Sequence, residues 1–420
     1  MSTLESKVRS YCNKFPAHFS KASQSQIIDT SGVSYLDFLS ACGSLNYGHN
    51  HPVLKNALIE HIKSDGLAIS LDLQTDVKSE FLSALHQHIL EPRDLNYVAQ
   101  FTGPTGANAV EAAIKLARKK TGRTNIIAFT NAFHGCTLGA LSLTANAFHR
   151  KSSSALLNNV THIPFDGYLG EHIDSADMLA RMLDDPSSGC NQPAAIIFET
   201  IQGEGGLNIA SAEWAKKILA IAEKHQALLI IDDIQAGCGR SGDFFSFEAL
   251  GIEPDIVILA KSLSGFGLPL SLNLIKPKFD VWEPGEHNGT FRGNAHAFVT
   301  ATAAIKHFWS TNKFHDELQN KITFLKQHLG VIAAKHGFKT KGKGFMQGIN
   351  FQDGNLCQSI AAACYENGLI IETCGSYDEI LKLLPALTIP ENELLRGLKI
   401  IDNAIGHILA TTSTTSSIRN

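Results

Sequence analysis

Four uninterrupted apolar stretches, separated by helix-like segments, constrain the fold of this chain more than any other feature. Strands are predicted at residues 126–129, 194–199, 227–232 and 255–260, and helices at 107–119 and 211–225. Strands that are apolar at every position are typical of a parallel sheet that helices cover on both faces. The sequence therefore predicts an α/β protein with a mostly parallel sheet.

The pattern changes after about residue 296. Two amphipathic helices are predicted at 296–310 and 314–336, short strands near 345–351, 369–372 and 380–384, and a last helix at 391–408. This alternation is typical of a smaller α+β domain. We expect a large α/β domain over residues 56–295, a small domain over 296–420, and an N-terminal segment, 1–55, that packs on the small domain.

Composition excludes several classes of function. Of the 420 residues, 44% are hydrophobic and 18% are charged, and the formal net charge is −4. This balance gives no indication of a nucleic-acid partner or a membrane surface, and no run approaches the roughly 18 apolar residues of a membrane span. The N-terminus lacks the apolar core of a secretory signal, so we expect a cytoplasmic protein. Eight scattered cysteines without a CxxC pair argue against zinc or disulfides, and we expect no metal site.

A lysine stands at the end of one predicted strand, where an apolar core makes a charge costly. Lys261 follows "DIVILA" and precedes the glycine-containing "SGFGLP". A desolvated lysine has a lowered pKa, and its neutral amine can attack a carbonyl to form a Schiff base. A lysine whose charged head extends to solvent is the alternative.

Polar residues also follow two of the other strands. Asp232 ends the strand "ALLIID". A buried acid there needs a cationic partner, such as a pyridinium nitrogen, an arginine or a metal, although it could also cap a helix. Phe133 and His134 stand beside a glycine in "NAFHG". Such an aromatic ring could stack on a planar ligand or belong to the core.

A Gly/Thr-rich turn precedes the helix predicted at 107–119. The free backbone N–H groups of Gly106 and Ala107, in "TGPTGANAV", would hold a phosphate at the helix N-terminus. A plain helix start is the alternative. A phosphate site, a stacking aromatic, a buried acid and a Schiff-base lysine together indicate one cofactor, pyridoxal phosphate.

Nearly the whole chain, from "LDFLSACGSLNYGHNHP" to "KLLPALTIPENEL", resembles the class III (ω-type) pyridoxal-phosphate aminotransferases of fold type I. "FTGPTGANAVEAAIKLARKKTGRTNIIAFTNAFHG", "KSLSGFGLPLSL" and "DVWEPGEHNGTFRGNAHAFVTATAA" are similar to its diaminobutyrate-forming subgroup of the ectoine pathway. The resemblance implies a large, mostly parallel seven-stranded sheet domain, a smaller α+β domain, and at least a homodimer with shared active sites.

The resemblance also implies roles for individual residues. Lys261 would form the Schiff base and move the proton during transamination. The other cofactor-binding residues would be Gly106 and Ala107 at the phosphate, Phe133 and Ile234 on the two ring faces, Asp232 at the ring nitrogen, Gln235 at the phenolic oxygen, the adjacent His134, and Thr290 at the phosphate of the neighbouring subunit.

Two positions depart from the family pattern. "DDIQAG" replaces the usual "DEVQTG", with Asp233 and Ala236 as the differing residues. Lys382, in "LKLLPAL", stands where many members have an arginine that binds the α-carboxylate of glutamate. Lysine offers a point charge rather than a planar fork. Glu204 matches the glutamate that pairs with this arginine, and both residues are candidate substrate-binding residues.

The reaction implied is transfer of an amino group from L-glutamate to L-aspartate 4-semialdehyde, which gives 2-oxoglutarate and L-2,4-diaminobutyrate, the first committed step of ectoine synthesis. A siderophore pathway could use the same product. One alternative is a class III relative that acts on ornithine, 4-aminobutyrate or another ω-amine, or that is a decarboxylase or lyase. Another is a non-catalytic or nucleotide-binding α/β protein in which Lys261 is structural.

Overall fold

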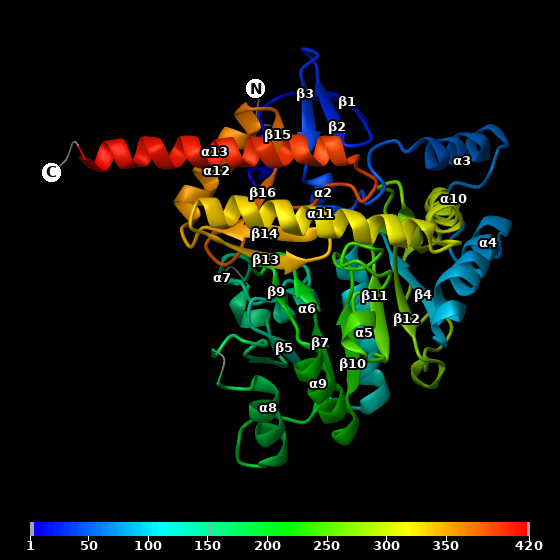
Figure 1. Ribbon diagram of the computed structural model, residues 1–420. Coiled ribbons are helices and arrows are strands. Elements are labelled where there is room, and N and C mark those ends of the chain that lie inside the picture. Colours follow the sequence, from blue (N-terminus) through cyan, green and yellow to red (C-terminus); the bar gives the residue numbers. More distant parts are fainter. Residues whose placement is uncertain (1–3, 152, 171, 418–420) are drawn as a thin grey trace.

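The computed structural model describes residues 4–417 except 152 and 171, and side chains in the last helix up to residue 411. Its largest sheet has seven strands in the order β4-β12-β11-β10-β7-β5-β6 (Figure 1). The strands are β4 (Val98–Gly103), β5 (Asn125–Phe129), β6 (Val160–Ile163), β7 (Pro193–Phe198), β10 (Leu228–Asp232), β11 (Ile256–Leu259) and β12 (Ser271–Ile275). Only β12 runs antiparallel to its neighbours among them. The predicted mostly parallel seven-stranded sheet is confirmed.

The continuous apolar runs are explained by helices on both faces of this sheet. Alternate residues of each central strand belong to two separate clusters: Ile230 packs with α5 (Gly106–Thr121), whereas Leu229 packs with Trp214 of α9 (Ala212–Lys224). Because both faces of the sheet are buried, its strands do not show the usual alternation of apolar and polar residues. The remaining helices of this region include α3 (Pro52–Lys63), α4 (Asp76–Leu85), α6 (Leu138–Leu143), α7 (Ala147–Arg150) and α8 (Ser175–Asp184).

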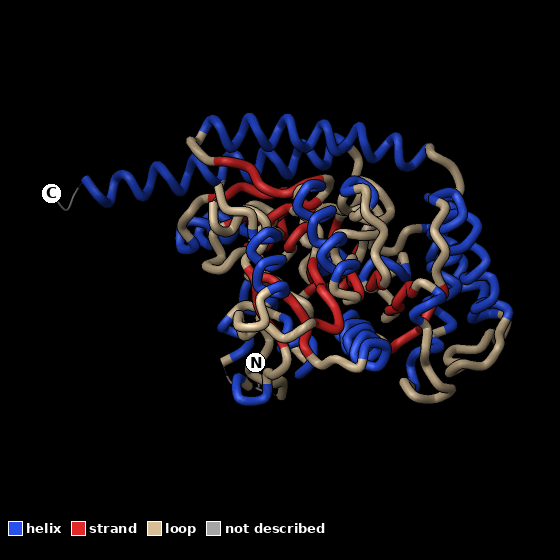
Figure 2. The backbone as a smooth tube through the Cα atoms, turned by 90° about the horizontal axis from the view of Figure 1, so that it is seen from below, coloured by secondary structure: helices blue, strands red, loops and turns tan. Residues whose placement is uncertain are grey.

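The second half of the chain builds a four-stranded sheet in the order β13-β14-β17-β16. Its strands are β13 (Lys339–Lys343), β14 (Met346–Asn350), β16 (Glu372–Cys374) and β17 (Ile380–Leu383), and its helices are α10 (Ala295–Ala304), α11 (Lys313–Lys335), α12 (Gly354–Glu366) and α13 (Glu391–Ser417). The last turns of α13 extend past the rest of the chain in both views (Figures 1 and 2). No described helix is long and apolar enough to cross a membrane.

The N-terminal strands join the C-terminal half of the chain. A four-stranded sheet has the order β1-β2-β3-β15, and Leu369 of β15 pairs with Leu36 of β3. Its strands are β1 (Phe19–Ser23), β2 (Gln26–Asp29), β3 (Ser34–Asp37) and β15 (Leu369–Ile370). The domain boundaries at residues 55 and 295 remain a prediction.

Three predicted elements differ from the structure. The strand expected at 369–372 is two strands in two sheets, because β15 pairs with β3 and β16 pairs with β17. The helix expected at 296–310 becomes a π-helix from Ile305 to Trp309, and the last helix extends beyond residue 408 to Ser417. A mostly apolar run such as "GLIIETC" does not reveal where the chain changes sheets.

Candidate active site

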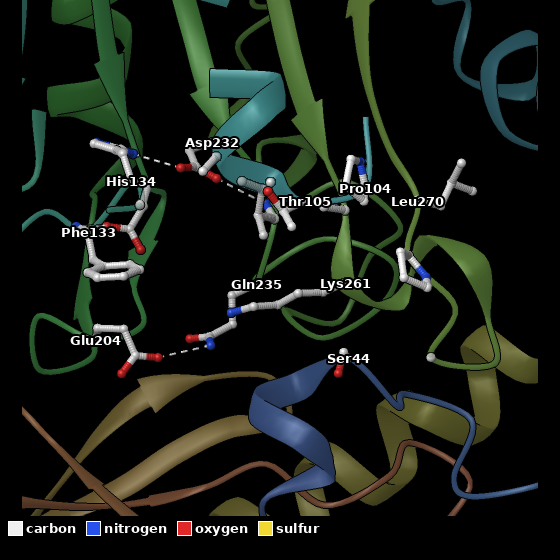
Figure 3. A pocket seen from close by; sticks show the side chains of 18 of the residues that line it. Ser44, Pro104, Thr105, Phe133, His134, Glu204, Asp232, Gln235, Lys261 and Leu270 are labelled. Atoms are coloured by element: carbon white, nitrogen blue, oxygen red, sulfur yellow. Dashed lines mark hydrogen bonds and ion pairs between the residues drawn. The ribbon is translucent and has the colours of Figure 1, made fainter. Parts of the chain in front are cut away.

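A cavity of about 440 Å³ lies at the carboxyl ends of the strands of the large sheet (Figure 3). Ligands bind at this edge in open α/β sheets, because the loops that follow parallel strands meet there. Here the loops follow β4, β5, β10 and β11. The cavity is lined by the predicted residues Gly106, Ala107, Phe133, His134, Glu204, Asp232, Ile234, Gln235 and Lys261. Neither Thr290 nor Lys382 lines it.

The N-terminus of α5 forms the phosphate end of the cavity. Asn108 Oδ1 accepts hydrogen bonds from the Thr105 N–H at 3.3 Å and the Thr105 hydroxyl at 2.9 Å, which fixes the turn before the helix. The first N–H groups of a helix have no intrahelical acceptor, so those of Gly106 and Ala107 are available to an anion. A Cβ at Gly106 would lie 2.6 Å from Ile234 Cδ1, so a larger residue here would displace the Ile234 side chain.

Asp232 is buried at the end of β10 and is held by His134. Its Oδ2 lies 2.7 Å from His134 Nδ1, and its Oδ1 accepts from the Ile234 N–H at 3.2 Å. Burial opposes the charged form of His134, but the hydrogen bond and the charge of Asp232 outweigh burial and raise the His134 pKa. The pair thus keeps a carboxylate fixed at the inner end of the cavity.

Glu199 is a second buried carboxyl group on the cavity wall. Its Oε1 accepts from the Phe133 N–H at 3.0 Å, and its Oε2 accepts from the Gly203 N–H at 3.2 Å. Burial raises the Glu199 pKa to about 7. Glu199 therefore fixes the loop of Phe133, whose half-buried ring lies at the cavity in Figure 3.

Lys261 is half-buried directly after β11 and has a backbone φ of 47°, which is unusual for a residue other than glycine. Ser262 secures this turn, because its hydroxyl donates to the Gly43 carbonyl at 2.8 Å and accepts from the Asn46 N–H at 3.2 Å. The Lys261 ammonium forms no hydrogen bond or ion pair with the residues described by the structure. Lys261 lines the cavity without a side-chain partner among these residues.

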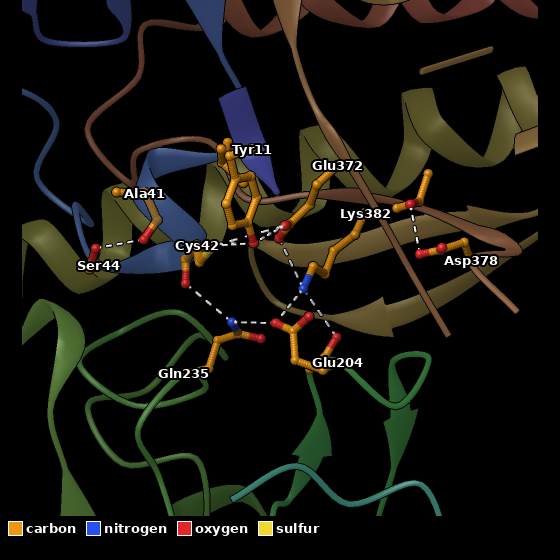
Figure 4. Close-up of polar contacts among 12 residues, drawn as sticks. Tyr11, Ala41, Cys42, Ser44, Glu204, Gln235, Glu372, Asp378 and Lys382 are labelled. Atoms are coloured by element: carbon orange, nitrogen blue, oxygen red, sulfur yellow. Dashed lines mark hydrogen bonds and ion pairs between the residues drawn. The ribbon is translucent and has the colours of Figure 1, made fainter. Parts of the chain in front are cut away.

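A buried cluster of charges lies beside the far end of the cavity (Figure 4). Lys382 Nζ lies 2.9 Å from Glu204 Oε1 and 3.0 Å from Glu372 Oε1. Tyr11 donates from its hydroxyl to Glu372 Oε2 at 3.1 Å. Sequence reasoning missed Glu372 and Tyr11. A charged residue inside the apolar run "GLIIETC" was a usable signal for Glu372, and nothing in the sequence marks Tyr11.

Thr290 lies outside the cavity, exposed at the start of a 3-10 turn, Thr290–Gly293. Metal ligation has no support in the described residues, which contain no cluster of three histidine, cysteine, aspartate or glutamate side chains able to hold an ion. The roles of Thr290 and the other predicted site residues toward a cofactor remain predictions.

The residues present fit pyridoxal phosphate. The α5 N-terminus suits a phosphate, Phe133 and Ile234 offer apolar surfaces to a flat ring, and buried Asp232 suits a protonated ring nitrogen. The unpartnered Lys261 amine suits covalent attachment. Gln235 Oε1 is also buried without a hydrogen-bond partner among the described residues, as expected of a polar group that a ligand completes.

Comparison with known sequences supports this interpretation. Residues 9–405 match the family model of class-III aminotransferases. The chain is 52% identical over 404 residues to the diaminobutyrate–2-oxoglutarate transaminase of Vibrio cholerae, with 96% of this chain and 98% of the relative covered. It is 50% identical over 411 residues to the protein of that name from Bordetella parapertussis, with 97% and 94% covered.

Solved structures share the fold at lower sequence identity. The ornithine aminotransferase of Toxoplasma gondii superposes with a TM-score of 0.83 at 23% identity, covering 97% of this chain and 93% of that one. A transaminase of the marine bacterium Virgibacillus superposes with a TM-score of 0.86 at 18% identity, covering 98% of each chain. At this identity the likeness supports the fold only.

Proposed function

The chain belongs to the class III aminotransferases, and on that premise we propose that it transfers the amino group of L-glutamate to C4 of L-aspartate 4-semialdehyde. The products are 2-oxoglutarate and L-2,4-diaminobutyrate. The observation that carries this proposal is the identity of about half of all residues, over nearly the full length, with transaminases named for diaminobutyrate and 2-oxoglutarate. We also propose that the enzyme acts in the cytoplasm and supplies ectoine synthesis, a siderophore pathway being the alternative.

Pyridoxal phosphate is the cofactor of this family, and when bound it carries the amino group between substrates while its ring withdraws electrons from the reacting carbon. The chain supplies the surroundings for this chemistry. Lys261 Nζ moves the proton at the carbon that bears the amino group. Asp232, oriented by His134, holds a proton on the ring nitrogen, because a buried carboxylate favours a neighbouring cation.

Both substrates use one site in turn, so we expect ping-pong kinetics. Initial rates measured at several fixed concentrations of L-aspartate 4-semialdehyde, with glutamate varied, should give parallel lines in a double-reciprocal plot.

Substrate preference is tested with 2-oxoglutarate as the amino acceptor. Ornithine and 4-aminobutyrate should each react at least about tenfold less efficiently than diaminobutyrate, a difference of roughly 1.4 kcal/mol in transition-state binding. Intersecting lines, or equal rates with 4-aminobutyrate, would contradict the proposal.

A second copy of the chain is proposed to cover an exposed apolar surface near the site. Leu67, Leu71 and Leu73 are 55%, 46% and 62% exposed, and Phe291 is 58% exposed. The two segments are joined, because the Ser70 N–H donates to the Gly293 carbonyl at 2.9 Å. Contiguous exposed apolar side chains are typical of an interface. Thr290 adjoins Phe291, which would place it at the neighbouring site.

Sedimentation velocity tests this interface. The wild-type chain should sediment with at least twice the mass of one chain, and Leu73→Glu combined with Phe291→Glu should shift it toward the monomer, because burying two carboxylates without partners is costly. Val331→Glu is the matched control, since Val331 is 69% exposed on α11. A wild-type monomer, or an equal shift for Val331→Glu, would contradict the interface.

A further inference from the structure

The Lys382 ammonium is fully enclosed and surrounded by acceptors. Its side chain is 0% exposed, and Nζ lies 2.9 Å from Glu204 Oε1 and 3.0 Å from Glu372 Oε1. The Gly203 carbonyl lies 3.3 Å away. Lys382 donates hydrogen bonds to Glu204 and to the Gly203 carbonyl, and it forms an ion pair with Glu372. Its side chain is fully enclosed and does not line the cavity, so a substrate carboxylate in the cavity does not reach Lys382 in this arrangement.

Glu204 presents the charge that does face the cavity (Figure 3). Its Oε1 accepts from both Lys382 and Gln235, the latter at 3.1 Å. Its Oε2 has no hydrogen-bond partner among the residues that the structure describes, and the side chain is 34% exposed. Burial opposes ionisation, but Lys382 and Lys261 outweigh it and lower the Glu204 pKa to about 2. One oxygen of a permanent carboxylate is thus open to a ligand.

Two carboxyl groups share one cation, Lys382, at this end of the cavity. Glu372 is only 3% exposed and burial raises its pKa, so Glu204 is the group that carries the negative charge facing the cavity. Lys261 is the other cation that acts on both carboxyl groups, and it lines the same cavity. A carboxylate arriving beside Glu204 would meet a like charge, whereas an ammonium group would gain a charge-assisted hydrogen bond.

We propose that the Glu204 end of the cavity is a subsite for an ammonium group, and that Glu204 Oε2 receives the α-ammonium of diaminobutyrate and of aspartate semialdehyde. This inference rests on the proposed function and specifies its substrate recognition. In diaminobutyrate the reacting amine is on C4 and the α-ammonium is two carbons away, so it points from Lys261 toward the far end. Lys382 is a positioning residue that holds Glu204 in place.

The test compares two amines that differ by one group. 4-Aminobutyrate is diaminobutyrate without the α-ammonium, and 1,3-diaminopropane is diaminobutyrate without the carboxylate. Each is mixed with the holoenzyme, and the absorbance change of the bound cofactor gives the rate and the apparent Kd of a single half-reaction. Glu204→Gln should lower the preference for diaminobutyrate over 4-aminobutyrate by roughly 10- to 100-fold, the range expected for a hydrogen bond between charged groups. The reaction of 1,3-diaminopropane should fall in parallel.

Glu372→Gln is the matched control, because it makes the same exchange in the same cluster at a residue that does not line the cavity. This variant should change the preference for diaminobutyrate over 4-aminobutyrate by less than about threefold. A residue that does not contact the substrate can act on it only through a weaker, longer-range electrostatic interaction. Glutamate brings no second ammonium to this end, so Glu204→Gln should affect its half-reaction much less than that of diaminobutyrate. Melting temperatures of both variants establish that they are folded.

The positioning role of Lys382 has a separate readout. Lys382→Met removes the cation that lowers the Glu204 pKa, so the preference for diaminobutyrate should become pH-dependent and decline as the pH falls through the raised pKa. Equal losses with diaminobutyrate and 4-aminobutyrate in Glu204→Gln, or equal effects of Glu372→Gln, would overturn the subsite alone. Failure of the wild-type holoenzyme to react with diaminobutyrate would overturn the proposed function and the subsite with it.

Discussion

Lys261→Ala should lower kcat by roughly 10³- to 10⁴-fold, the upper range for loss of a positioned proton-transfer group. The Lys261 amine lies in the cavity without a hydrogen bond or ion pair to any described residue. Alanine removes both the covalent attachment point and the group that moves the proton. No other lysine lines the cavity among the residues that the structure describes.

Borohydride reduction of the holoenzyme, followed by peptide mass spectrometry, provides the measurement. The wild-type chain should carry the reduced cofactor on the peptide that contains Lys261, and the variant should carry none. Lys276→Ala is the matched control, because Lys276 adjoins Asp255 at the opposite edge of the same sheet, 3.5 Å from its carboxylate. A trapped adduct that persists in Lys261→Ala, or that is lost in Lys276→Ala, would contradict the assignment.

Lys261 and Asp232 could be predicted from the sequence because each follows an unbroken apolar run. Such runs identify strands of a covered parallel sheet, and the carboxyl ends of these strands meet at one edge. The strand predicted at 255–260 is Ile256–Leu259 in the structure, and the one at 227–232 is Leu228–Asp232. Local patterns alone therefore predict that Lys261 and Asp232 lie at the same edge of the sheet.

Glu372 and Tyr11 could not be placed in this way. Tyr11 meets Glu372 across 361 residues of sequence, and that contact depends on how the N-terminal segment and β16 are brought together. Strand order is equally non-local, because β12 inserts antiparallel between β4 and β11. The hydrophobic periodicity of a segment predicts that it is buried, but not which other segments it contacts. The two carboxyl groups beside Lys382 could therefore be identified only from the structure.

Asp232→Asn should lower kcat/KM by roughly 10²- to 10³-fold, the effect of removing one preorganised electrostatic contact to the reacting group. The amide can still hydrogen-bond to His134, 2.7 Å away, so the loop should keep its position. What is lost is the negative charge that favours a proton on the ring nitrogen. The cofactor should still be trapped on Lys261 by borohydride, which separates this defect from loss of binding.

Asp233, the residue that follows Asp232 in the sequence, provides a matched control. Asp233 is 1% exposed, does not line the cavity, and accepts through Oδ2 from the Ser246 N–H at 3.0 Å. Burial raises the Asp233 pKa to about 7, so an amide replaces a group that is already partly neutral at neutral pH. Asp233→Asn should therefore retain kcat/KM within about tenfold. Similar losses in the two variants would mean that burial of negative charge, rather than contact with the ring nitrogen, explains the effect of Asp232→Asn.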